Sequence, residues 1–98
     1  MIAVSTAELT LVRQILQTHV PECEVRAFGS RVRGTNKPHS DLDLVILGAE
    51  RLPVPRLGLL QEAFRDSTLP FRVDVLDWHA IPASFHDIIN AGYETIWP

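Results

Sequence analysis

The sequence predicts a single α/β domain, in which helices pack on a sheet of short strands. Three segments place apolar residues at helical spacing, and short apolar runs with the length of strands lie between them. The chain has 98 residues, of which 46% are hydrophobic, so it can bury one modest core. We therefore expect residues 1–98 to form one domain.

Composition excludes several classes of protein. The net charge of −3 and the pI of about 5.7 argue against a general nucleic-acid binder, which usually carries a basic face. No apolar run approaches the roughly 20 residues that cross a membrane, and the N-terminus lacks the pattern of a signal peptide. Cys23 is the only cysteine, so no intramolecular disulfide can form and a reducing cytoplasm is expected.

The first helix is expected from about Thr6 to His19. Ser5 and Glu8 form a capping box, in which each side chain satisfies a backbone N–H group of the first turn. Pro21 ends the helix. Its apolar side is formed by residues at helical spacing, namely Leu9, Val12, Ile15 and Leu16.

A strand over 23–28 leads into a Gly-Ser pair. Gly29 allows a sharp turn and a close approach of another group. Ser30 to Gly34 fits a single helical turn whose amides face an anion such as phosphate, with Arg31 and Arg33 beside it. Taken alone, the Gly-Ser pair fits an ordinary turn and the arginines fit a solvated loop.

The second strand is expected over 41–47, after a polar loop over 35–40. Asp41 and Asp43 then point to the same side, with Cα atoms about 6.6 Å apart at roughly 3.3 Å per residue. The surrounding apolar run indicates a strand that is covered on both faces. Asp41 also fits a turn or cap, but a carboxylate at Asp43 inside a buried strand is costly unless it is paired or binds a metal.

The rest of the chain supplies a third acidic position. A helix over 56–66 precedes a third strand over 71–76, and a helix over 82–91 precedes a final strand over 93–97. Asp74 lies in the middle of the third strand and would complete a cluster with Asp41 and Asp43 if the two strands are neighbours. An exposed position on an edge strand is the alternative for Asp74. Asp77 is a rival third carboxylate, but its odd offset places it on the opposite face, and we prefer Asp74.

These residue types together indicate metal-assisted nucleotidyl transfer. Two divalent ions held by carboxylates can clamp the attacking and leaving oxygens, and Mg²⁺ prefers carboxylate, phosphate and water oxygens. Asp41 and Asp43 suit the ion on the nucleotide side, and Asp74 suits the second ion and activation of the hydroxyl. The phosphates suit the backbone and hydroxyl groups of the Gly-Ser pair and the two nearby arginines, that is, Gly29, Ser30, Arg31 and Arg33.

The motifs resemble those of a known family. Gly29-Ser30, followed after ten residues by Asp41-Leu42-Asp43, resembles the signature of the minimal nucleotidyltransferases (MNT) of the DNA polymerase β superfamily. Asp74 within Val73-Asp74-Val75 looks like the third carboxylate of that family. The resemblance covers nearly the whole chain and implies a polymerase-type palm, a mixed sheet with helices packed on it. It also implies Mg²⁺, with two ions, and ATP as the substrate.

The resemblance further implies a partner, because no acceptor-binding domain is present. In this family the partner is commonly an all-helical HEPN toxin, an RNase, and the nucleotidyltransferase is its antitoxin. The antitoxin acts by transferring AMP to a tyrosine of the toxin or by contact alone. Transfer to a hydroxyl of a small molecule by a homo-oligomer is a further alternative.

Overall fold

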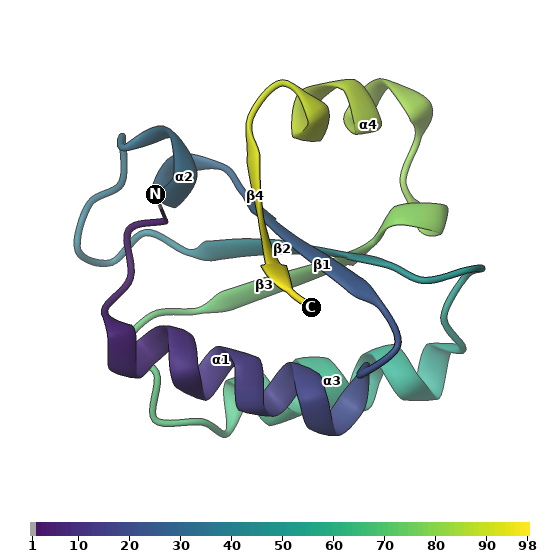
Figure 1. Cartoon of the computed structure of the whole chain (residues 1–98), viewed down its shortest axis with the longest axis horizontal. Coiled ribbons are helices and arrows are strands. Elements are labelled where there is room, and N and C mark those ends of the chain that lie inside the picture. Colours follow the sequence, from purple (N-terminus) through teal and green to yellow (C-terminus); the bar gives the residue numbers. More distant parts are fainter. Residues whose placement is uncertain (1) are drawn as a thin grey trace.

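Four strands form one mixed sheet in the order β3-β2-β1-β4 (Figure 1). Strand β1 pairs antiparallel with both β2 and β4, whereas β2 and β3 run parallel. The structure is a computed structural model and describes residues 2–98. This mixed sheet agrees with the expected palm-type architecture. The strands are β1 (Glu24–Phe28), β2 (Leu42–Leu47), β3 (Val73–Asp77) and β4 (Tyr93–Trp97).

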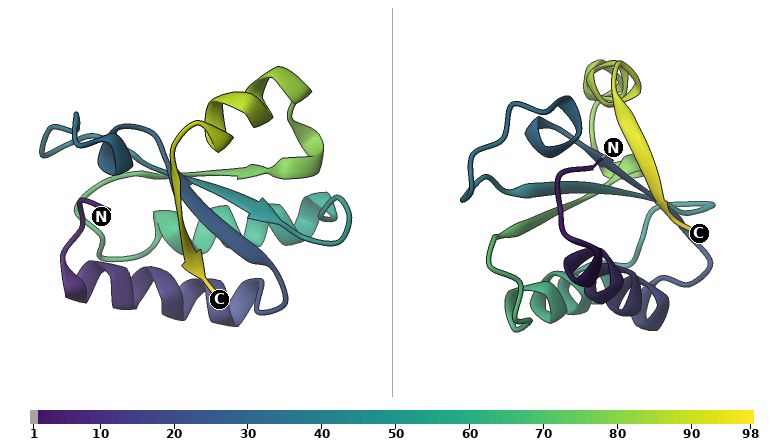
Figure 2. Two further views of the ribbon diagram at one scale, coloured as in Figure 1. Left: turned by 45° about the horizontal axis from the view of Figure 1, so that its top comes forward. Right: turned by 60° about the vertical axis from the view of Figure 1, so that its left-hand side comes forward.

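The helices lie in two layers. Helices α1 (Thr6–His19) and α3 (Val54–Arg65) lie side by side on one face of the sheet, and α2 (Ser30–Arg33) and α4 (Ala83–Asn90) lie on the other (Figures 1 and 2). A short 3₁₀ helix, η1 (Trp78–Ala80), joins β3 to α4. Within residues 2–98, no helix has both the length and the apolar character needed to cross a membrane.

Helix α1 has the bounds that its sequence predicts. The Ser5 hydroxyl accepts a hydrogen bond from the Glu8 N–H at 3.0 Å, and the Glu8 carboxylate accepts one from the Ser5 N–H at 2.8 Å. This reciprocal pair is the expected capping box. It fixes where the helix starts, and the apolar stripe that contains the buried residues Val12 and Leu16 sets which side faces the sheet.

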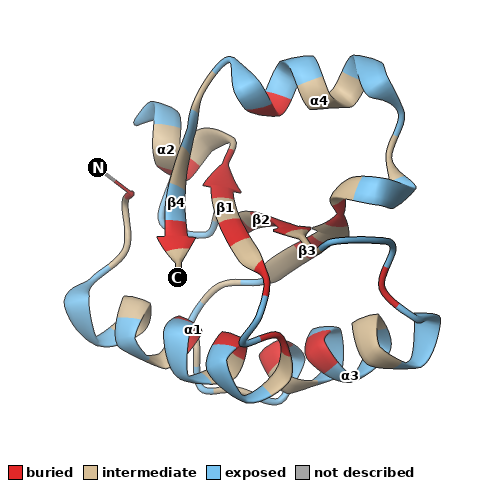
Figure 3. Ribbon diagram, turned by 45° about the vertical axis from the view of Figure 1, so that its right-hand side comes forward, coloured by how far each residue is buried: buried red, intermediate tan, exposed pale blue. Residues whose placement is uncertain are grey.

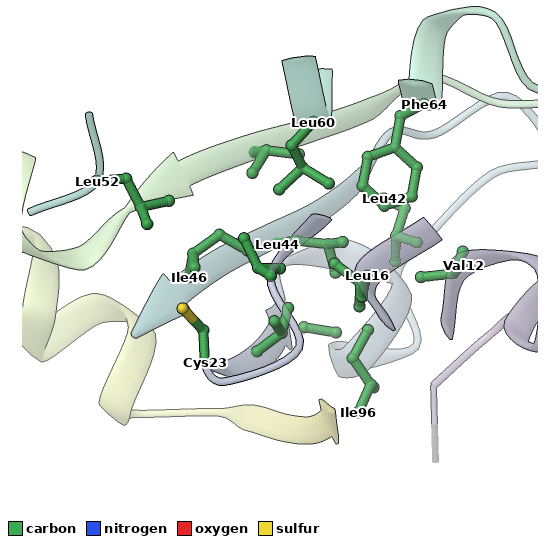
Figure 4. Packing of buried hydrophobic residues seen from close by; sticks show 14 of the residues in the cluster. Val12, Leu16, Cys23, Leu42, Leu44, Ile46, Leu52, Leu60, Phe64 and Ile96 are labelled. Atoms are coloured by element: carbon green, nitrogen blue, oxygen red, sulfur yellow. The ribbon is translucent and has the colours of Figure 1, made fainter. Parts of the chain in front are cut away.

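The larger core lies between the sheet and the pair α1 and α3 (Figures 3 and 4). Strand β2 contributes Leu42, Leu44 and Ile46 to it, all fully buried. Val45 turns to the other face and packs in a smaller cluster with Phe28 and Ile89 of α4. Strand β2 is therefore covered on both faces, as predicted, and the next residue on the α4 face of β2 is Asp43.

Several boundaries differ from the expected ones, most of them by one or two residues. Helix α3 starts at Val54 and not at residue 56, because prolines are well tolerated in a first helical turn, where their missing N–H has no partner to lose. Strand β3 starts at Val73 and extends to Asp77, so Asp77 belongs to the strand. The turn η1 was not expected. It is capped by the Asp77 carboxylate, which accepts a hydrogen bond from the His79 N–H at 3.0 Å.

Candidate active site

Two carboxylates stand side by side on the α4 face of the sheet. Asp43 of β2 and Asp74 of β3 are register partners in the parallel ladder. Side chains alternate between faces along a strand, and Leu76, two residues after Asp74, packs in the α4-side cluster. The ladder therefore brings the two predicted acids together across neighbouring strands.

The surroundings of Asp43 disfavour its ionised form. Burial raises the pKa of Asp43 above its ordinary value, and the nearby carboxylates of Asp74 and Asp41 raise it further, while the cation of Arg33 lowers it. Asp41 is half-buried and precedes β2, which begins at Leu42. The three predicted acids therefore act on one another electrostatically, and they leave negative charge that a bound cation would balance.

The three acids do not form a closed set of metal ligands in the chain alone. Within residues 2–98, no group of three or more His, Cys, Asp and Glu side chains is arranged to hold a metal ion. The chemistry of the donors nevertheless fits Mg²⁺, which takes one or two carboxylates together with phosphate and water oxygens.

Gly29 is required where the backbone meets the acid pair. Its φ is +80°, a region that L residues rarely adopt, and a Cβ at this position would collide with the Asp43 carboxylate. The Asp43 Cγ would lie only 3.3 Å from that Cβ. The predicted helical turn follows at once as α2, in which the Gly29 carbonyl accepts hydrogen bonds from Val32 and Arg33. The Gly-Ser turn thus lies directly against the β2 carboxylate.

A cavity of about 350 Å³ opens beside this turn. Four of the predicted site residues line it, namely Gly29, Arg33, Asp43 and Asp74, and Ser30 and Asp41 adjoin members of this set along the chain. The opposite wall is apolar and was not predicted as part of a site. It is formed by Phe28 and Leu76 of the sheet and by the α4 segment, with Phe85, Ile88, Ala91 and Gly92. The pairing of Phe85 with Ile88 at helical spacing was the available signal, but it predicts an ordinary core face equally well.

Arg31 has a different role from the expected one. Its side chain is only 5% exposed, and its guanidinium donates hydrogen bonds to the carbonyls of Ala3, Pro38 and Ser40 at 2.8–3.1 Å. It also lies over the Phe71 ring, 4.2 Å from the centroid. The structure therefore gives Arg31 the role of fastening the N-terminal segment and the 38–40 loop, in place of the phosphate contact that we expected.

Asp77 also has a structural role. It is 3% exposed, and its carboxylate accepts hydrogen bonds from the backbone N–H groups of Leu52 at 2.7 Å and His79 at 3.0 Å. It is three residues from Asp74 and lies on the opposite face of β3, as the odd offset predicts. This placement favours Asp74 as the third carboxylate of the site.

Comparison with known proteins agrees with this arrangement. The model of the nucleotidyltransferase domain family matches residues 9–97. The chain is 46% identical over 93 residues to the probable protein adenylyltransferase MntA of Haemophilus influenzae, and the match covers 95% of this chain and 82% of that protein.

Solved structures share the fold. A toxin–antitoxin crystal structure with AMP-PNP matches with a TM-score of 0.77 at 22% identity, over 91% of this chain and 72% of that one. A chain in the structure of a tri-AMPylated Shewanella oneidensis HEPN toxin in complex with MNT antitoxin matches with a TM-score of 0.70 at 18% identity, over 93% of this chain and 70% of that one. Because the family model matches residues 9–97 and a relative is 46% identical over 95% of the chain, this chain belongs to the nucleotidyltransferase domain family.

Proposed function

We propose that this chain transfers AMP from ATP to a tyrosine hydroxyl of a partner protein, and that it is the antitoxin of a HEPN-type toxin. The observation that carries the proposal is the pairing of Asp43 with Asp74 in a cavity against the Gly29 turn. The adenylyltransferase name of the relative and the toxin–antitoxin assemblies of the structural neighbours support the choice of nucleotide and partner. The cytoplasm is the compartment that suits the single free thiol, at Cys23.

The acidic residues suit the metal that the family uses. Asp41, Asp43 and Asp74 would hold Mg²⁺, with two ions, which would supply charge neutralisation for the phosphates and for the oxygens that attack and leave. The raised pKa of Asp43 supports this assignment. Burial and two neighbouring carboxylates disfavour its negative charge, and a bound cation would offset that effect.

The Gly-Ser turn suits the triphosphate. Gly29 has no side chain, so phosphate oxygens can approach the backbone beside Asp43. Ser30 offers a hydroxyl at the first position of α2, and exposed Arg33 offers a cation that lines the cavity. The apolar wall from Phe28 to Ile88 leaves a dry side for the rest of the nucleotide.

The reaction requires one bond to form and one to break at the α-phosphorus. The acceptor oxygen bonds to that phosphorus, the bond to the β-phosphate bridging oxygen breaks, and pyrophosphate leaves. The acceptor proton passes to the Asp74 carboxylate or to water beside it. Asp43 orients the nucleotide side, and Asp74, on the strand nearer the edge, lies on the acceptor side.

Label transfer from α-labelled ATP tests this function. The chain is co-expressed and purified with its partner, and wild type is compared with Asp43→Asn and Asp74→Asn. Label on the partner with wild type only, mapped to a tyrosine by mass spectrometry, is the expected result. A matched control is Glu50→Gln, which changes the charge equally at an exposed loop residue. Unchanged neutralisation of the partner by both Asn variants would instead indicate an antitoxin that acts by contact alone.

A further inference from the structure

The strand that carries Asp74 is an edge of the sheet. Strand β3 is the last in the order β3-β2-β1-β4. The Arg72 carbonyl accepts a hydrogen bond from the Leu42 N–H at 2.9 Å, and Asp74 is paired with Asp43. Alternate residues of β3 therefore bond to β2, and the N–H and C=O groups of Val73 and Val75 point away from the sheet. Such an edge is a template for another strand at Val73 and at the Val75 N–H, whereas the Val75 carbonyl already accepts a hydrogen bond from Gln61.

A second cavity lies along this edge and is larger than the one described above, at about 610 Å³. Its walls come from the C-terminal half of α3, the following loop and β3 itself. Asp74 lines both cavities, so this residue separates the edge from the candidate active site. The edge groove, as we name the second cavity, is lined by Gln61, Phe64, Arg65, Leu69, Phe71, Arg72, Val73, Asp74 and Val75.

The two faces of the groove differ in chemistry. On the α3 side Phe64, Leu69 and Phe71 supply an apolar floor that belongs to or packs against the main core. Arg65 and Arg72 are both exposed and add positive charge at its rim. Asp74 also lines the groove. The Gln61 amide donates a hydrogen bond to the Val75 carbonyl at 3.4 Å, so α3 covers the edge of β3 at Val75.

We propose that the edge groove binds an extended, non-helical acceptor segment of the otherwise helical partner as an added, fifth strand beside β3, with its tyrosine on the Asp74 face. This proposal rests on the proposed function and specifies the substrate of the same site. Residues on either side of that tyrosine point to the opposite face, so they are apolar and pack on Phe64 and Phe71. An acidic residue two positions from the tyrosine shares its face and pairs with Arg72, which lies two residues before Asp74.

The spacing of strands in a sheet allows the tyrosine hydroxyl of the added strand to reach the Asp43–Asp74 pair. Neighbouring strands lie about 4.8 Å apart. The side chain of tyrosine is longer than this spacing, so a phenol lying across the sheet from an added strand reaches past β3 toward Asp43. The hydroxyl then meets the α-phosphate side of the acid pair, and Asp74 lies beneath it. A serine in the same place would stop short of the pair, and this favours tyrosine as the acceptor.

The first test uses two synthetic peptides of identical composition, acetylated and amidated at their ends. One has the order glutamate-valine-tyrosine-valine-glutamate, which puts both valines on the apolar floor. The other has the order valine-glutamate-tyrosine-glutamate-valine, which puts both glutamates there. With millimolar peptide, hydrogen exchange measured by NMR at the Val73 and Val75 amides slows with the first peptide and not with the second. Equal or absent protection at these amides overturns the proposal, whether or not AMP is transferred.

The second test measures AMP transfer to the co-purified partner. Arg72→Glu raises the KM for the partner about tenfold or more and leaves kcat and the affinity for an ATP analogue unchanged, whereas Arg51→Glu, an equally exposed arginine outside the groove, changes neither. Val73→Pro removes one outward N–H without breaking the β2 ladder and raises the same KM. Transfer that is insensitive to both groove variants overturns the edge docking and leaves the proposed function intact. Protected Val73 and Val75 amides without any transfer would support the docking and contradict the function.

Discussion

Asp43 and Asp74 are neighbours across the parallel β2–β3 ladder, although the whole of α3 lies between them in the chain. Two carboxylates at paired positions repel each other, and Asp41 adds to this repulsion. The site therefore holds an unfavourable charge arrangement when no cation is bound. This arrangement has consequences for stability, for pH dependence and for the tolerance of nearby positions to substitution.

Asp43→Asn is expected to stabilise the fold at neutral pH. The pKa of Asp43 is raised by burial and by Asp74 and Asp41, so the folded state holds this proton more tightly than the unfolded state does. Ionisation above the folded pKa then costs stability, and the cost disappears as the pH falls below the ordinary value of 3.8. The expected gain is less than about 1 kcal/mol, because water screens a half-exposed carboxylate. Urea unfolding at several pH values, with Glu50→Gln as the control, measures it, and a loss of stability at neutral pH would contradict this account.

Binding of an ATP analogue in the presence of Mg²⁺ is expected to weaken in mildly acidic solution. A proton on Asp43 competes with the metal, and its raised pKa brings that competition to a higher pH than an ordinary aspartate would show. Calorimetry at a series of pH values measures the effect. Asp43→Asn should bind weakly at every pH. A pH dependence that is unchanged in Asp43→Asn would assign the titration to another group.

Gly29→Ala is expected to abolish nucleotide binding, whereas Gly34→Ala is not. Both residues have positive φ, +80° and +77°, so both substitutions strain the backbone. That strain costs on the order of 1–2 kcal/mol at Gly34 and up to about 3 kcal/mol at Gly29, whose ψ of −157° is accessible almost only to glycine.

Only the Gly29 methyl group would collide with Asp43, since nothing lies within 4 Å of a Cβ at Gly34. Unfolding curves and analogue binding are measured on both variants. Equal loss of binding in the two variants would show that backbone strain alone is responsible.

Substitution of Arg31 is expected to lower stability, whereas substitution of Arg33 is expected to weaken nucleotide binding. Arg31→Ala leaves three carbonyls without their donors and lowers the free energy of unfolding by about 3 kcal/mol, at roughly 1 kcal/mol for each hydrogen bond. Arg33→Ala, at an exposed position, changes stability by less than about 0.5 kcal/mol but weakens the binding of the ATP analogue about tenfold, as loss of a charge-assisted contact predicts. Denaturant unfolding and calorimetry measure both. Similar profiles for the two variants would contradict these roles.

Substitution of Asp77 is expected to lower stability, whereas substitution of Asp74 is expected to abolish AMP transfer. In Asp77→Asn the amide NH₂ faces a backbone N–H donor, so one of the bonds to Leu52 and His79 is lost and stability falls by about 1–3 kcal/mol. AMP transfer by the folded fraction persists. Asp74→Asn shows the reverse pattern, with retained stability and lost transfer. Loss of transfer in Asp77→Asn at a temperature where it is fully folded would reassign the third carboxylate.

Local signals predicted most of the elements. The capping box at Ser5 and Glu8 defines the start of α1, and the alternation around Asp43 predicts both the faces of β2 and its burial. These features depend on residues that are close in the sequence. The pairing of Asp74 with Asp43 depends on strand order, and it was expected only through the resemblance to the family.

Most of the features that sequence did not predict depend on residues that are far away in the chain. The Arg31 guanidinium is buried because the Ala3 carbonyl and the 38–40 loop fold over it, and nothing near Arg31 in the sequence indicates this. Asp77 caps η1 and binds the Leu52 N–H across the α3 crossover. The apolar cavity wall forms because α4 packs over Phe28, and its spacing resembles that of any core helix.

The alternation of β3 also protects the site against misalignment. Val75 and Asp77 face the main core, and Asp74 faces the cavity beside the Gly29 turn. Slippage of β3 by one residue against β2 would turn Asp74 into the hydrocarbon interior and remove Asp77 from its two donors. A molecule with β3 in the wrong register would thus be unstable as well as inactive. The carboxylate of Asp74 therefore also disfavours the wrong register during folding.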